Sequence, residues 1–184
     1  MEKIVTITYL ELRRGDPEGV ARPIPEGFDL VRMGTPQPAV NRFLYTAVGG
    51  DWYWIDQLDR PLSWWRDRVE TPGFETWLLM ADGAIAGYFE LEPHGPGTVE
   101  IAYFGLLPPF VERRGLGGPL LCEAIRRAWE IGAERITVET CSMDHPGALA
   151  NYRKRGFLVV ETRSSPRVFD EAPPGPWPGA RHDA

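Results

Sequence analysis

The stretch Leu107–Leu121, LPPFVERRGLGGPLL, decides how this chain folds. It runs from the apolar end of an expected strand, through a glycine-rich turn, into an expected amphipathic helix. Glycines let the backbone approach a ligand closely, and the first turn of a helix offers unpaired N–H groups and partial positive charge. Arg113 and Arg114 add full charges at the same place. The stretch therefore predicts a pocket for an anion such as a pyrophosphate.

Two other phosphate-binding loops do not fit this turn. The P-loop requires a Lys-Ser or Lys-Thr pair after its second glycine, whereas Gly117 is followed by Gly118 and Pro119. The dinucleotide-binding fingerprint requires a third glycine or alanine where Leu120 stands. A Gly-x-Gly tripeptide alone is also typical of a tight turn with no ligand, so the residues around it decide its meaning.

A second motif, His145–Phe157 (HPGALANYRKRGF), follows downstream. Together the two motifs resemble those of the GNAT superfamily of N-acyltransferases, which use acetyl-CoA or a related acyl-CoA. The resemblance covers roughly Trp77 to Val168. Two positions depart from it, since Glu112 replaces a Gln or Arg and His145 replaces an Asn. The residues that fit the first motif are Leu107, Pro109, Gly115, Gly117, Leu120 and Leu121.

The resemblance implies an α/β fold of the α+β type, with a central, mostly antiparallel mixed sheet, splayed strands and flanking helices. It implies direct transfer of an acetyl group from acetyl-CoA to a primary amine of a small molecule or peptide. The acyl-CoA would contact the backbone and side chains of Gly105, Leu106, Leu107, Arg113, Arg114, Gly115, Leu116, Gly117, Gly118 and His145. A backbone N–H near Leu107 is the expected oxyanion donor.

Two residues are expected to move protons. Glu100 is the expected general base, directly or through a water, because its strand would run beside the thioester. The alternative is a solvated strand residue, since Val99 and Ile101 face the other way. Tyr152 occupies the tyrosine position of the family motif and is the expected general acid; the alternative is a tyrosine that only packs on the sheet.

The region before the glycine turn is rich in aromatic residues, and most of them are expected to pack in the core. Trp52, Tyr53 and Trp54, on an expected loop after the Gly49-Gly50 pair, are predicted to line the acceptor pocket. No pattern of metal ligands is expected.

Composition is typical of one globular domain, expected over residues 1–170, followed by a proline-rich tail over 171–184. The net charge of −6, without a long Lys/Arg run, argues against a nucleic-acid partner. Short apolar runs and two cysteines favour a cytoplasmic protein with no membrane partner. A homodimer, another short acyl-CoA as donor, and a non-catalytic acyl-CoA-binding sensor or interaction module stay open.

Hydrophobic patterning predicts a mixed order of strands and helices. Asp82-Gly83 is the clearest hairpin signal, and Pro119 is tolerable only in the first turn of its helix. Strands are expected over 3–12, 76–80, 85–91, 98–107, 135–140 and 157–162, with another around 167–169. Helices are expected over 39–48, 62–69 and 147–155, and from the glycine turn to a C-terminal cap at Gly132.

Overall fold

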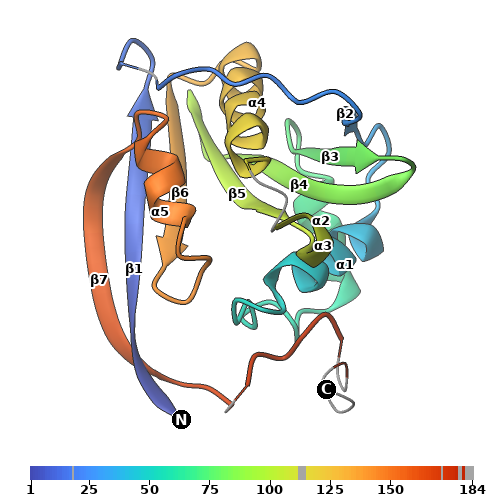
Figure 1. Cartoon of the computed structure of the whole chain (residues 1–184), viewed down its shortest axis with the longest axis vertical. Helices are drawn as coiled ribbons and strands as arrows, with labels where there is room; N and C mark the ends of the chain where they lie inside the picture. Colours follow the sequence, from blue (N-terminus) through green and yellow to red (C-terminus); the bar gives the residue numbers. More distant parts are fainter. Residues whose placement is uncertain (18, 112–114, 171, 178–179, 181–184) are drawn as a thin grey trace.

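The computed structural model describes residues 1–17, 19–111, 115–170, 172–177 and 180 (Figure 1). The strands of this part of the chain are β1 (Glu2–Arg13), β2 (Asp29–Arg32), β3 (Glu75–Ala81), β4 (Ala84–Pro93), β5 (Thr98–Leu106), β6 (Arg135–Cys141) and β7 (Leu158–Val168). Its helices are α1 (Pro38–Gly49), α2 (Leu62–Val69), α3 (Pro108–Val111), α4 (Gly117–Glu130) and α5 (Ala148–Arg153). The strands form one sheet in the order β2-β3-β4-β5-β6-β1-β7, and only the β5–β6 pair is parallel. The predicted mixed, mostly antiparallel sheet with flanking helices is confirmed.

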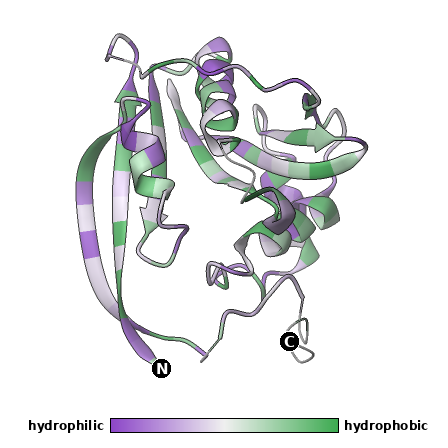
Figure 2. Cartoon of the chain, viewed as in Figure 1, coloured by the Kyte–Doolittle hydropathy of each residue, from purple (hydrophilic) through white to green (hydrophobic). Residues whose placement is uncertain are grey.

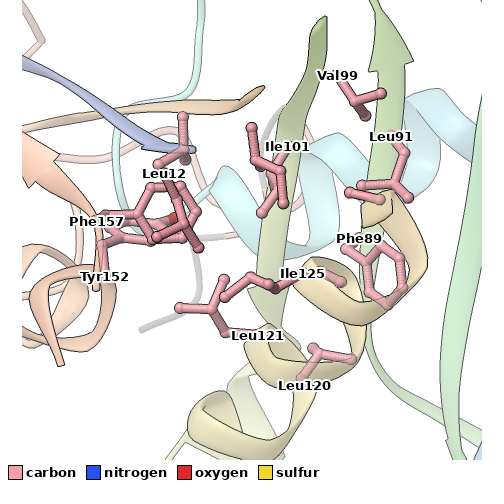
Figure 3. Close-up of a cluster of buried hydrophobic side chains, with 14 of the residues drawn as sticks. Leu12, Phe89, Leu91, Val99, Ile101, Leu120, Leu121, Ile125, Tyr152 and Phe157 are labelled. Carbon is pink, nitrogen blue, oxygen red and sulfur yellow. The ribbon is translucent and has the colours of Figure 1, made fainter. Parts of the chain in front are cut away.

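Helices cover both faces of the sheet. Consecutive residues of β4 show this, because Phe89 packs in the cluster with α4 whereas Tyr88 packs against α1. Figure 3 shows Leu120, Leu121 and Ile125 of α4 beside the side chains of β4 and β5. The outer strand β7 carries hydrophilic bands along its length (Figure 2), as expected for an edge strand with solvent on its outer side.

The β5–β6 pairing is short, and its end creates the central opening of the molecule. The strands pair from Thr98 opposite Arg135 to Glu100 opposite Thr137, and no further. Just beyond, the register between β4 and β5 shifts so that Ala102 has no partner on β4. Such a bulge bends a strand and increases its twist, so β5 turns away from β6.

One predicted feature of the C-terminal region differs in the structure. The strands expected over 157–162 and around 167–169 are one continuous strand, β7. Pro166 lies opposite Ile4 within it, and an edge strand accommodates a residue that lacks an N–H. The segment after it runs back over the loop that follows α1, where the Gly175 N–H donates to the Gly50 carbonyl at 3.0 Å. The division into a domain and a tail stays a prediction.

Gly105 illustrates how the opening is shaped. An interior glycine predicts either a bulge or a close approach of another backbone or side chain. The bulge lies at Ala102, and Gly105 is the close approach, since a Cβ there would lie 2.4 Å from Cγ1 of Val48 on α1. The short elements β2 and α3 were not predicted, because four residues carry too little periodicity to detect.

Candidate functional site

A cleft of about 280 Å³ occupies the opening between β5 and β6. It is lined by the glycine turn and α5 at one end and by the loop after α1 at the other. Six of the predicted cofactor-binding residues line it: Gly105, Leu106, Gly115, Leu116, Gly117 and His145. Leu107 and Gly118 lie outside its lining, and Arg113 and Arg114, like Glu112, fall outside the described residues.

The first turn of α4 faces this cleft without a side-chain cap. Its N-cap residue, Leu116, makes no side-chain hydrogen bond to the helix, so the first N–H groups are not satisfied by a cap. The side-chain amide of Asn151 donates to the Gly117 carbonyl at 3.0 Å and holds the turn against α5. An uncapped, glycine-rich helix start of this kind binds anions well.

The backbone of β5 presents alternate N–H groups to the cleft. The Leu107 N–H donates to the Ala86 carbonyl at 2.9 Å, on the β4 side, and is therefore already used. Successive N–H groups of a strand point to opposite edges, so those of Leu106 and Phe104 point to the edge that has no partner strand. The free donor nearest to the predicted oxyanion position is thus that of Leu106.

Tyr152 projects from α5 into the cleft and is only 5% exposed. Its ring lies 6.1 Å from that of Phe104 and 5.9 Å from that of Phe157. Figure 3 shows Tyr152 beside Phe157. Burial raises the pKa of the Tyr152 phenol above its ordinary value, and the Asp144 carboxylate raises it further. The phenol therefore keeps its proton, as a general acid must.

Glu100 lies in a second cavity, of about 370 Å³, on the α2 side of the sheet. Its Oε2 is 2.5 Å from Nε2 of His94. The second cavity is lined by Trp64, Asp67, Arg68, Glu92, His94, Glu100, Ala102, Tyr103 and Glu139. Because Ala102 and Glu139 also line the first cleft, the two cavities meet at the point where β5 and β6 separate.

Glu139 is a candidate that sequence reasoning missed. Desolvation raises the pKa of its carboxyl, and the neighbouring carboxylates of Glu100 and Asp144 raise it further. It lies two residues beyond Thr137, which pairs with Glu100, so both carboxylates share one face of the sheet. Only the register between β5 and β6 could have identified it.

The side chains of the predicted acceptor loop point in two different directions. Trp52 and Trp54 line the cleft, and the Trp52 ring lies 5.2 Å from that of His145. Tyr53 adopts a φ of 58° and packs against Phe169, with ring centroids 4.9 Å apart. The structure therefore brings Trp52 and Trp54 to the cleft and Tyr53 to the segment after β7.

Arg68 fixes the wall of the second cavity. Its Nη1 lies 2.5 Å from Oε2 of Glu90 and its Nη2 lies 2.8 Å from Oε2 of Glu92. The guanidinium is also 4.8 Å from the Phe74 ring centroid and 4.7 Å from that of Tyr103. This arrangement ties α2 to β4 and β5 through one buried side chain.

The comparisons with known proteins agree with this geometry. The family model described as the acetyltransferase (GNAT) family matches residues 41–157. The chain belongs to the acetyltransferase (GNAT) family. The match contains the whole of β5, the glycine turn and α5, which are the parts of the GNAT domain that form the cleft. Comparison with curated proteins gives no match.

Solved structures share the fold. A GCN5-related N-acetyltransferase from Kribbella flavida is 23% identical with a TM-score of 0.61, and 90% of this chain covers 58% of that one. The GCN5-related N-acetyltransferase from Sphaerobacter thermophilus is 18% identical with a TM-score of 0.64, over 89% and 50% of the two chains. An aminoglycoside acetyltransferase from a soil metagenome, in complex with trehalose, is 15% identical with a TM-score of 0.56, over 71% and 88%. The GNAT chain described here thus spans about half to three-fifths of the first two relatives.

Within the described ranges, no three His, Cys, Asp or Glu side chains are grouped as metal ligands. In the same ranges, no helix is both long and apolar enough to cross a membrane.

Proposed function

We propose that this GNAT protein transfers an acetyl group from acetyl-CoA to a primary amine by direct attack in a ternary complex. The observation that carries the proposal is the cleft itself. It joins an uncapped helix start, the unpaired edge of β5 and a buried, protonated tyrosine in one space. Acetyl-CoA would supply the thioester.

The residues present fit such a donor. The glycine turn and the first N–H groups of α4 would hold the pyrophosphate. The free N–H groups of Phe104 and Leu106 would pair with the pantetheine arm and with the carbonyl oxygen, where negative charge develops. Tyr152 would donate its proton to the departing thiolate.

The amine would enter through the second cavity. Glu100 would accept its proton, directly or through a water, at the side where the two cavities meet. Glu139 is a second candidate for this role, since it lines both cavities and has a raised pKa. Trp52 and Trp54 would close the acceptor side of the cleft, and the proposal for Tyr53 is limited to positioning that loop.

The walls of the second cavity favour a cationic acceptor. Asp67, Glu92, Glu100 and Glu139 contribute carboxylates, of which Glu92 pairs with Arg68 and Glu100 with His94. Trp64 and Tyr103 contribute aromatic surface. A similar structure is an aminoglycoside acetyltransferase from a soil metagenome in complex with sisomicin, so polycationic amino sugars are one class to test. The net charge of −6 and the free cysteines support a cytoplasmic setting without nucleic-acid or membrane partners. Monomer and homodimer are both compatible with the proposal.

A screen for thiol release tests this function. The full chain is incubated with acetyl-CoA and a panel of small-molecule amines, aminoglycosides and peptides, and free CoA is measured. We expect amine-dependent release that is strongest for acceptors with two or more positive charges. If calorimetry shows binding of acetyl-CoA but no amine causes thiol release, the result would instead support an acyl-CoA sensor. If another short acyl-CoA gives a higher kcat/KM than acetyl-CoA, that acyl-CoA is the donor.

A further inference from the structure

The segment after β7 packs on the loop that carries Trp52 and Trp54. Figure 1 shows this segment crossing from the end of β7 to the side of the molecule that carries α1. Phe169 is only 6% exposed and Gly175 is buried, although nearly all of β7 before them is exposed. The segment is therefore attached to the protein at two points, and both of them lie on the loop after α1.

The first attachment joins two glycines. The Gly175 N–H donates to the Gly50 carbonyl at 3.0 Å, and a Cβ at Gly50 would lie 2.3 Å from both the carbonyl carbon and the carbonyl oxygen of Gly175. The φ of −59° and ψ of −29° at Gly50 are ordinary helical values, so the backbone conformation does not require glycine there. Glycine is needed at Gly50 because the backbone of the segment after β7 lies directly against it.

The second attachment is a ring contact with Tyr53. Its ring lies 4.9 Å from that of Phe169, and Nζ of Lys3 lies 5.2 Å from the Tyr53 ring centroid. Tyr53 adopts a φ of 58°, a left-handed conformation that costs free energy for a residue with a Cβ. Its neighbours Trp52 and Trp54 line the cleft. The contact with Phe169 thus holds Tyr53 in a conformation that the loop alone disfavours, and this conformation leaves both indoles on the cleft side.

An ion pair adds little to these two attachments. Nη1 of Arg167, at the end of β7, lies 3.1 Å from Oδ2 of Asp56 in the same loop. Both side chains are exposed, and exposed ion pairs stabilise a structure only slightly. The packing of Phe169 and Gly175 therefore provides most of the attachment.

We propose that the segment after β7 positions Trp52 and Trp54 for the acceptor, with Phe169 and Gly175 as its positioning residues. The inference rests on the proposed function for its ligand, an amine on the acceptor side of the cleft. When the segment is released, Tyr53 leaves its strained conformation and the loop moves. The amine then binds only the fraction of molecules that keep both indoles in place. Acceptor affinity thus depends on two residues that lie outside the lining of the cleft.

Steady-state kinetics of two single variants test the proposal. In Gly50→Ala the new Cβ meets the backbone of Gly175, whereas in the matched control Gly34→Ala it meets no atom within 4 Å. Phe169→Ala removes the ring contact, and Phe169→Leu keeps part of the packing. We expect KM for the best amine to rise about fivefold or more in Gly50→Ala and Phe169→Ala, less in Phe169→Leu, and not in the control.

The kinetic split identifies a positioning role. At saturating amine, kcat should stay at the wild-type value, because the bound acceptor selects the molecules with the loop in place. The Kd of acetyl-CoA by calorimetry should also stay unchanged, because the glycine turn lies at the other end of the cleft. A lower melting temperature of Phe169→Ala with an unchanged KM would instead assign Phe169 a purely structural role and overturn the proposal.

A double variant tests whether the two attachments act together. Either substitution alone releases the same segment, so Gly50→Ala combined with Phe169→Ala should raise KM little more than the larger single effect. A rise equal to the product of the two single effects would overturn the common role of the segment. Should Phe169→Ala fail to fold, Gly50→Ala and Phe169→Leu take its place in the comparison.

Fluorine NMR of the full chain labelled with 5-fluorotryptophan reads the two indoles without any acceptor. The variants Trp52→Phe and Trp54→Phe assign the resonances. We expect both resonances to shift or broaden in Gly50→Ala and Phe169→Ala and to stay unchanged in the Gly34→Ala control. Unchanged resonances in all three variants would overturn the positioning role.

The outcomes separate this inference from the proposed function. If no amine releases CoA from the wild type but the indole resonances move as expected, the proposed function fails and the positioning of the indoles stands. If the wild type acetylates an amine and Gly50→Ala and Phe169→Ala keep its KM, the proposed function stands and the positioning role is overturned. Neither thiol release nor a change in the resonances would refute both.

Discussion

The indole Nε1 of Trp54 donates a hydrogen bond to Oδ1 of Asp144, 2.9 Å away, and so joins the loop after α1 to the loop between β6 and α5. The other carboxylate oxygen of Asp144 accepts from the Thr140 hydroxyl at 2.7 Å and the Cys141 N–H at 2.8 Å. Both Trp54 and Asp144 line the cleft. One carboxylate therefore connects the two sides of the opening.

Replacing Trp54 by Phe should loosen this connection. The substitution keeps an aromatic ring but removes the donor to a charged acceptor, which is worth about 1.5–3 kcal/mol. We expect a loss of unfolding free energy of that order by urea denaturation, together with a higher KM for the amine. Trp177→Phe, at an exposed position, is the control and should behave as wild type. An unchanged stability of Trp54→Phe would show that the bond contributes nothing.

Replacing Tyr152 by Phe should reduce turnover without reducing affinity for acetyl-CoA. The ring still packs between Phe104 and Phe157, while the proton donor is lost. A positioned general acid contributes about 100-fold or more, and we expect kcat to fall by that order. The check is steady-state kinetics with the best amine, beside calorimetry with acetyl-CoA. Full turnover in the variant would refute the general-acid role.

The choice between Glu100 and Glu139 as base can be read from a pH profile. A general base acts only when deprotonated, so kcat/KM rises with pH through its pKa. Glu139 has a pKa raised by desolvation and by the charge of Glu100. If Glu139 is the base, Glu100→Gln should shift the acid limb to lower pH with activity retained. If Glu100 is the base, the same variant should lose about 100-fold or more at all pH values and Glu139→Gln should not.

The buried pair of Glu90 and Arg68 should be the most sensitive site for stability. Glu90 is completely buried. Arg68 contacts its Oε2, and Nδ2 of Asn41 donates to its Oε1 at 2.7 Å. Replacing Glu90 by Gln removes one charge of a buried pair, which costs about 3–5 kcal/mol. Urea denaturation should show this loss, and a smaller one for Glu92→Gln, whose side chain is partly exposed. An equal loss of unfolding free energy in the two variants would show that the burial of Glu90 does not make its ion pair with Arg68 more important for stability.

Buried tyrosines should make the fold sensitive to alkali. Burial raises the pKa of Tyr45, Tyr88, Tyr103 and Tyr152. In the unfolded chain tyrosines ionise near pH 10, so above that pH the unfolded state binds fewer protons than the folded state. The stability that these tyrosines contribute is therefore fully present below about pH 10 and is lost as pH rises further. Denaturant unfolding between pH 8 and 11 measures this, and a flat profile would contradict it.

Local signals predicted much of the fold. The helix over Leu62–Val69 has the expected bounds, and the Asp82-Gly83 turn has φ values of 49° and 78°, as its sequence indicates. The glycine turn was found because glycines, prolines and an amphipathic helix occur within a few residues. Features that depend on partners distant in the sequence were not predicted. Glu139 reaches the site through the β5–β6 register, which no local pattern of residues reveals.

The placement of β1 has a consequence for how the molecule is made. The first strand of the chain lies between β6 and β7, which come last, and pairs with both over most of its length. Pairings between such distant segments are slow to form, because the long chain between them must close into a loop before any stabilising contact forms. During synthesis on a ribosome, β1 can complete these pairings only after β6 and β7 have emerged. β6 pairs with β1 on one side and, through three residue pairs, with β5 on the other, so the cleft takes its shape only once these distant segments have paired.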